Sequence, residues 1–138
     1  MLREFVRSSK AMSDETRARI LNLLAHSELC VCQFMVILDM GQSTVSKHLG
    51  ILKNAGLVEM EKRGTWSFYR LSKDKTNAHN RDFIRLLPSL PKDDPILQKD
   101  NRSLNEVSKK GVAFCSVVAL KKKRRARSIH AGEERCDR

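Results

Sequence analysis

The chain has 138 residues, a length that suits one small domain with little left over for a second. Lysine and arginine number 27 against 16 acidic residues, and the net charge of +11 is typical of a surface that binds phosphate. No stretch approaches the roughly 20 apolar residues that cross a bilayer, and no apolar block follows the first basic residues, so we expect no membrane partner and no secretory signal. These features predict a cytoplasmic protein, in which the four cysteines are free thiols.

Apolar residues recur at helical spacing in the first part of the chain. The four expected helices cover residues 2–12, 14–25, 32–39 and 43–55. Ser13 or Asp14 can cap the second helix, because their side-chain oxygens accept the free amides of a first turn. Gly56 ends the fourth helix. Residues 26–29 are expected to form a break between helices.

After the fourth helix the period changes to that of strands. Residues 57–61 and 65–71 predict two strands, joined by a tight turn at Lys62-Arg63-Gly64. Three helices, a glycine turn, a longer helix and a β-hairpin are the parts of a winged helix-turn-helix, in that order. The expected fold is therefore mainly α with a β-hairpin wing. The low aromatic content, 5%, suits a small domain that completes its core with a second copy, so we expect a dimer.

Beyond residue 72 the periodic signal weakens. Residues 77–87 and 96–107 are expected to be helical, with prolines interrupting between them. A run of cations follows at residues 121–127, and such a tract cannot bury itself. We therefore expect a DNA-binding and dimerisation domain over residues 1–108 and a flexible basic tail over residues 109–138.

The 43–55 helix has one apolar face and one polar face. Successive helical residues are turned by about 100°, so Val45, Leu49 and Leu52 share the buried side. The opposite side is small, polar and free of acids, as expected of a helix that enters the major groove, whereas a merely solvated face is usually richer in Glu and Lys. The candidate DNA contacts are Gln42, Ser43, Thr44, Ser46, Lys47, His48 and, in the hairpin turn, Lys62 and Arg63. For His48, a hydrogen bond at the edge of the core is an equal alternative.

Two cysteines, Cys30 and Cys32, stand at the start of the third helix. A helix N-terminus lowers a thiol pKa and favours the thiolate that binds soft ions. Helical residues two apart point about 200° away from each other, so one ion can bind both sulfurs only if this turn deforms. Such a deformation would strain the helix-turn-helix and release DNA. The alternative is that both cysteines only fill the core. A disulfide between them is disfavoured by geometry and compartment.

Several segments, taken in order, resemble the arsenic-responsive repressors of the ArsR/SmtB family over about residues 10–72. These segments are Ser13-Asp14-Glu15-Thr16-Arg17, Glu28-Leu29-Cys30-Val31-Cys32, Ser43-Thr44-Val45-Ser46-Lys47-His48-Leu49, Ala55-Gly56-Leu57-Val58, and Gly64-Thr65-Trp66 followed by Tyr69-Arg70-Leu71.

The resemblance implies a homodimer, joined through its first and last helices, that binds an inverted repeat in double-stranded operator DNA and represses a metalloid-resistance operon. It implies that arsenite or antimonite, As(III) or Sb(III), is the inducer and binds the matching positions Cys30 and Cys32. DNA binding itself would need no cofactor. The resemblance also predicts a transcriptional repressor and not an enzyme, in keeping with the lack of a base held beside either cysteine.

The chain departs from these relatives in its further ligands. Arsenite repressors often carry a third cysteine three residues after the second, and here that position is Met35, whose thioether is a poor arsenite ligand. A cellular thiol, or Cys115 or Cys136 from either subunit, would then complete the site, although Cys115 lies in an apolar run that favours burial.

Other inducers remain as alternatives for the same thiols. Relatives that sense cadmium or lead carry additional N-terminal cysteines, and this chain has none before Cys30. Relatives that sense zinc pair aspartate and histidine on the last helices, where His79, with Asp82 near it, is the only histidine. A winged-helix repressor that senses oxidants or reactive sulfur would use Cys30 and Cys32 themselves.

Overall fold

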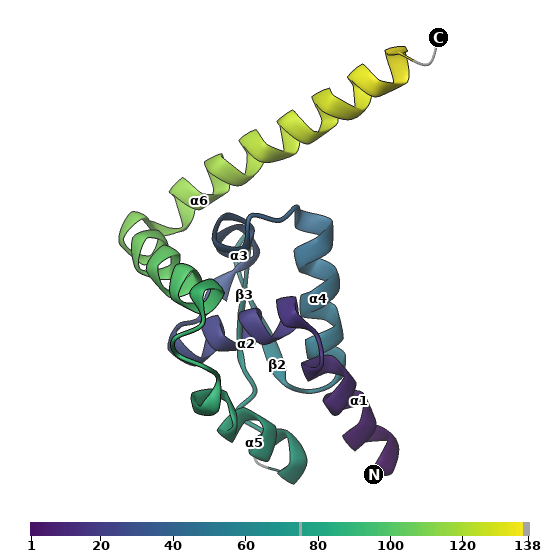
Figure 1. The fold of residues 1–138 in the computed structure, drawn as a ribbon, viewed down its shortest axis with the longest axis vertical. Helices are drawn as coiled ribbons and strands as arrows, with labels where there is room; N and C mark the ends of the chain where they lie inside the picture. The colour runs from purple at the N-terminus through teal and green to yellow at the C-terminus, as the bar shows by residue number, and fades with distance from the viewer. Residues whose placement is uncertain (75, 137–138) are drawn as a thin grey trace.

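A computed structural model describes residues 1–74 and 76–136 and shows a winged helix-turn-helix followed by a long C-terminal helix (Figure 1). The elements in order are α1 (Leu2–Met12), α2 (Glu15–His26), β1 (Leu29–Cys30), α3 (Val31–Leu38), α4 (Gln42–Asn54), β2 (Val58–Arg63), β3 (Trp66–Leu71), α5 (Ala78–Arg85), the 3-10 helix η1 (Leu87–Ser89) and α6 (Pro95–Cys136). The predicted fold class is confirmed, and the first four helices begin and end within two residues of the predicted limits.

The helix-turn-helix is held together by apolar side chains of α2, α3 and α4. Val45, Leu49 and Leu52 of α4 are fully buried, as their spacing predicted, and they pack in one cluster with Ile20 of α2 and Phe34 of α3. Burying a side chain of this size stabilises the fold by about 1.5–3 kcal/mol. This cluster therefore fixes how the exposed side of α4 is presented.

The ends of these helices follow from local chemistry. Asp14 caps α2 by accepting a hydrogen bond from the Arg17 amide at 3.0 Å, and this bond is the main reason why the pKa of Asp14 is lowered. Gly56 ends α4 at φ 77°, a conformation that glycine adopts without strain. A Cβ at Gly56 would also come within 2.9 Å of the Asn80 side-chain nitrogen, which donates to the Ala55 carbonyl at 2.8 Å and so joins α5 to α4.

The small sheet has the order β1-β3-β2, and its first strand was not predicted. Of the break expected at residues 26–29, residues 27 and 28 form no helix or strand, but Leu29 pairs with the hairpin, opposite Tyr69, and Cys30 pairs opposite Phe68. The hairpin turn also lies further along than predicted: Lys62 and Arg63 are residues of β2, paired with Ser67 and Trp66. The start of α3 is thus joined directly to the wing.

The last helix, α6, has two parts separated by a kink at Gly111, where φ is 80° and ψ is 171°. The first part is attached to α2 by an ion pair of Arg19 with Asp100, a side chain that is fully buried. The second part runs past α3 and extends away from the rest of the chain (Figure 1). Within the described residues, no helix combines the length and the apolarity that a membrane span requires.

The second part of α6 includes residues that the sequence placed in a tail. Cys115 and Ala119 are buried and belong to the apolar core, so packed residues occur beyond the boundary expected at residue 108. Their packing depends on contact with α3, which the sequence does not show. The flexibility expected of residues 109–138 concerns motion and stays a prediction.

Candidate thiol site and nucleic-acid interface

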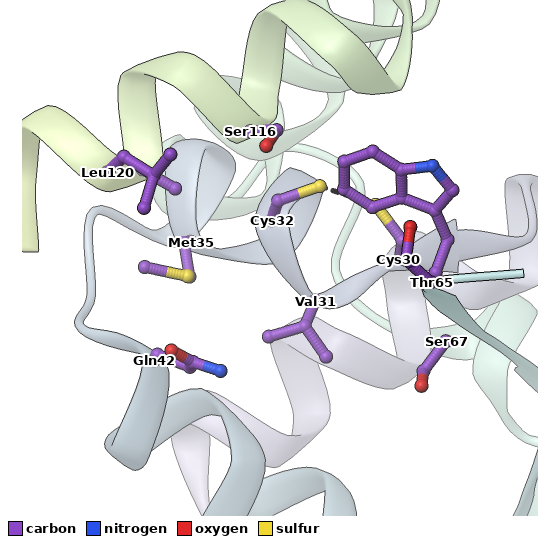
Figure 2. A pocket seen from close by; sticks show the side chains of 11 residues that line it. Cys30, Val31, Cys32, Met35, Gln42, Thr65, Ser67, Ser116 and Leu120 are labelled. Carbon is purple, nitrogen blue, oxygen red and sulfur yellow. Dashed lines mark hydrogen bonds between the residues drawn. The ribbon is translucent and has the colours of Figure 1, made fainter.

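The two cysteines of the predicted site are in contact. Cys30 is the N-cap of α3 and has an extended backbone, with φ −92° and ψ 165°. Cys32 lies in the first turn of the helix, and the two Sγ atoms are 2.6 Å apart (Figure 2). The prediction that the sulfurs point to opposite sides of a helical turn is therefore wrong, because Cys30 is not a helical residue. For the same reason, the geometric argument against a disulfide between the two cysteines no longer holds.

The contact sets the protonation of the pair. The hydrogen bond from the Cys32 thiol is the largest cause that lowers the pKa of Cys30, to about 7, and the amides of Gln33 and Cys32 add to it while burial opposes it. The pKa of Cys32 is raised, because its proton is held by the Cys30 sulfur and because the side chain is buried. Near neutral pH the pair thus supplies one thiolate and one thiol, a nucleophile beside a donor.

Gln33, which sequence reasoning missed, positions Cys30. Its side-chain oxygen accepts a hydrogen bond from the Cys30 amide at 2.9 Å, while the Gln33 amide donates to the Cys30 sulfur. This is a capping box in which cysteine takes the place usually held by serine or threonine. A glutamine three residues after Cys30 is the signal in the sequence that indicates this arrangement.

Gln33→Ala is expected to reduce the free energy of unfolding by about 1–3 kcal/mol, because the buried Cys30 amide loses its acceptor. Urea unfolding followed by circular dichroism measures the change. Gln98→Ala, at an exposed glutamine of α6, is the matched control and is expected to leave the midpoint unchanged. Equal midpoints for both variants would show that the capping box contributes nothing to stability.

The thiols line a pocket of about 240 Å³ that four parts of the fold enclose (Figure 2). Its lining outside the cysteines includes Met35 of α3, Gln42 of α4, Thr65 and Ser67 of the hairpin, and Ser116 and Leu120 of α6. Gln42 is the first residue of α4, the expected recognition helix, and Thr65 is at the tip of the wing. A ligand at the thiols therefore lies against both elements that are expected to read DNA.

The residues considered as a third ligand differ in where they lie relative to this pocket. Met35 is buried at its edge, and Cys115 is buried next to the lining residue Ser116. Burial is the main cause that raises the pKa of Cys115, and the negative charge of Cys30 adds to it. The side chain of Cys136 lies outside the described residues. Within the described part of the chain, no three His, Cys, Asp or Glu side chains are grouped closely enough to hold an ion.

The predicted DNA-reading face lies at the N-terminal end of α4. Gln42, Ser43, Thr44, Ser46 and Lys47 are exposed. His48 is half-buried, with Nδ1 3.3 Å from Arg17 Nη1 and 3.8 Å from an Asp14 carboxylate oxygen. The alternative of a hydrogen bond at the edge of the core is thus what the structure shows for His48, and DNA contact by this face stays a prediction.

The two cations expected at the wing tip differ in their surroundings. Lys62 is exposed. Arg63 donates to Glu28 at 2.8 Å and to Glu61 at 3.0 Å, and its guanidinium lies 4.7 Å from the centre of the Phe68 ring. Because Glu28 is two residues before Cys30, Arg63 joins the wing to the thiol segment.

Fold and site together define a winged-helix DNA-binding protein with a thiol pocket against its recognition helix. The family described as "Bacterial regulatory protein, arsR family" matches residues 14–60, a range that contains both cysteines. The chain belongs to the ArsR family; it is a transcriptional repressor, as predicted, and not an enzyme.

Similar proteins include two regulators known from sequence. The chain is 43% identical to the uncharacterized HTH-type transcriptional regulator MJ1325 of Methanocaldococcus jannaschii, over 59% of this chain and 88% of that protein. It is 37% identical to the arsenical resistance operon repressor of Bacillus subtilis, over 56% of this chain and 75% of that protein. A solved structure, the homodimeric winged helix-turn-helix domain of Mb0332 from Mycobacterium bovis, superposes with a TM-score of 0.55 at 32% identity and covers 64% of this chain and 76% of that chain.

Proposed function

We propose that the chain is a metalloid-responsive repressor, which binds operator DNA as a homodimer and dissociates when arsenite or antimonite binds Cys30 and Cys32. The observation that carries this proposal is the contact of the two sulfurs, 2.6 Å apart, in a pocket shared with α4 and the wing. The arsenical resistance operon repressor of Bacillus subtilis supports the choice of inducer. In the reducing cytoplasm, where we place the protein, both thiols stay available.

The proposed DNA contacts come from the exposed end of α4 and from the wing. Hydroxyl and amide groups at this end of α4 offer donors and acceptors to base edges, and Lys47 adds one cation. The N-terminus of α4 places free amides near phosphate. Lys62 reaches a neighbouring phosphate from the wing, and a dimer would repeat these contacts on an inverted repeat.

The proposed dimer interface is the apolar face of α1 and α5. It keeps the first helix that the resemblance implies and has α5 in place of the last helix, α6. Leu2, Phe5 and Val6 are exposed on α1, and Leu86 is exposed at the end of α5. Phe5, His79 and Phe83 form an aromatic cluster between these helices. His79 Nε2 is buried without a hydrogen-bond partner among the described residues, and a second chain can supply one. A second copy of the chain would cover this face, as Mb0332 is homodimeric.

The proposed coupling between the thiols and the DNA-binding elements passes through few residues. Thiolate–metal bonds of the zinc type are about 2.3 Å long, so one ion between two sulfurs requires them to be roughly 3.5 Å apart. The two sulfurs must then move apart from their present contact. Cys30 is paired with Phe68 of β3, and Gln42 of α4 borders the same pocket. The opening therefore acts on the wing and on the recognition helix together.

The test measures, by fluorescence anisotropy, how tightly the protein binds a labelled duplex that carries the DNA upstream of its own gene. Arsenite and antimonite are expected to raise the Kd by about 5–150-fold, the range of ordinary allosteric coupling. A phosphine reductant should not reverse this effect. If neither metalloid changes the Kd at any concentration that leaves the protein folded, the proposal is wrong.

A second candidate is a repressor that senses oxidants through the same pair. The low pKa of Cys30 and the contact with Cys32 favour it, because a peroxide can take two electrons from the pair and leave a disulfide and two water molecules. Release by peroxide that a reductant reverses, together with no release by arsenite, would establish this candidate in place of the first.

A further inference from the structure

The part of α6 that follows Gly111 forms one wall of the thiol pocket. Cys32 Sγ lies 3.9 Å from the Val112 carbonyl oxygen, and Ser116, Ala119 and Leu120 line the pocket. Figure 2 shows this part of α6 lying beside Cys32 and Met35, with Ser116 and Leu120 on it. A segment about eighty residues away in the sequence is therefore part of the site.

Cys115 lies on the inner face of this wall. Cys115 and Ala119 are four residues apart, so they share one side of the helix. Ala119 lines the pocket, and both residues are buried, with Cys115 completely so. Cys115 is also next in sequence to Ser116, which lines the pocket. The helix thus carries a third thiol on its buried side, next to residues that line the pocket of the pair.

We propose that Cys115 of the same chain is the third ligand of the metalloid and that residues 112–120 close onto the ion when it binds. This inference rests on the proposed function and adds its ligand set. Arsenous acid carries three hydroxyl groups. Each cysteine replaces one of them, forming an As–S bond and breaking an As–O bond. The proton of a thiol leaves with the hydroxide as water, and for the Cys30 thiolate the solvent supplies that proton. Two cysteines leave one As–OH unreplaced, and the Met35 thioether has no proton to exchange.

The movement that closure requires has a hinge at Gly111. The three thiols are not grouped closely enough to hold an ion as they stand, so the wall must shift toward the pair. Gly111 already interrupts α6 at φ 80°, and beyond its chain neighbours and the nearby backbone of its own helix, no atom lies within 4 Å of where its Cβ would be. Backbone angles can change there without a side chain in the way. The residues on either side of the kink can then keep their helical form while the second part turns.

The experiment uses the full chain loaded with arsenite in a buffer that contains a phosphine and no small thiol. Arsenic K-edge X-ray absorption counts the sulfur neighbours of the ion. We expect three sulfurs in the unsubstituted chain and in the matched control Cys136→Ala. We expect two sulfurs and one oxygen in Cys115→Ala, which keeps a small apolar side chain in the core. The arsenite concentration for half-release should rise by about tenfold or more in Cys115→Ala.

The outcomes separate the two proposals. Two sulfurs and one oxygen in the unsubstituted chain would overturn the role of Cys115 and leave the proposed function standing. Three sulfurs in Cys115→Ala would overturn it as well. No sulfur neighbours in the unsubstituted chain would overturn the proposed function. The number of sulfur neighbours in the unsubstituted chain can by itself overturn the role of Cys115. The test therefore does not depend on whether Cys115→Ala folds.

Discussion

Cys30→Ser and Cys32→Ser are each expected to bind operator DNA as tightly as the unsubstituted chain and to remain bound when arsenite is added. A hydroxyl does not replace a thiolate as a ligand for a soft ion, so one lost sulfur leaves the site with a single sulfur of the pair. Serine is itself a good N-cap, and Cys30→Ser should keep the capping box with Gln33. The fold and the DNA-reading face should therefore be retained.

Anisotropy titrations with and without arsenite measure this result. For the unsubstituted chain the ratio of the two Kd values should lie at about 5–150, and for both variants it should fall close to one. Cys136→Ser is the matched control, because it removes a thiol at the far end of α6. It should release DNA like the unsubstituted chain. Undiminished release from either Cys30→Ser or Cys32→Ser would place the inducer site elsewhere.

Asp100→Ala is expected to reduce the free energy of unfolding by about 3–5 kcal/mol, because it leaves Arg19, whose side chain is only 17% exposed, without its charged partner. The carboxylate of Asp100 accepts two hydrogen bonds from the Arg19 guanidinium, at 2.8 Å and 2.9 Å, and the Asp100 side chain is fully buried. A single domain of this kind has a stability of about 5–15 kcal/mol. Loss of this one carboxylate would thus remove a large part of the total.

Urea unfolding of three further variants shows whether the loss comes from the unpaired arginine. The double variant Arg19→Met, Asp100→Leu removes both charges and should recover most of the stability. Asp82→Ala breaks the pair of Asp82 with Arg85, whose side chains are 67% and 70% exposed, and should leave the midpoint unchanged. Arg19→Met alone should destabilise the chain, because it leaves the buried carboxylate unpaired. If Asp100→Ala matches Asp82→Ala, the ion pair does not hold α6 in place.

The helices of the DNA-binding unit could be predicted because their signals are local. Val45, Leu49 and Leu52 recur at helical spacing, and all three are buried in α4. The cap of α2 at Asp14 and the stop at Gly56 depend only on side chains within a few residues. The hairpin strands follow from the change of period, although the turn lies beyond the predicted position.

The candidate site could be predicted only in part. The identity of the two thiols and their position before the recognition helix are visible in the sequence. The contact of their sulfurs is not, because it depends on the extended backbone of Cys30, which β1 holds by pairing with β3 some forty residues later. Arg63 was expected to be available to DNA, and it is joined instead to Glu28 and Glu61. The sequence does not show which acids will lie beside it.

By itself the sequence determined the first four helices and the hairpin in their order, the family and the identity of the two thiols, since periodicity, caps and short motifs involve neighbours along the chain. The tertiary structure alone decided that the cysteines touch, that Asp100 holds α6 against α2, and that residues after Gly111 cover the thiol pocket. These features join residues up to about eighty positions apart. Contacts over such separations form when apolar faces pack together, and no local pattern states which faces will meet.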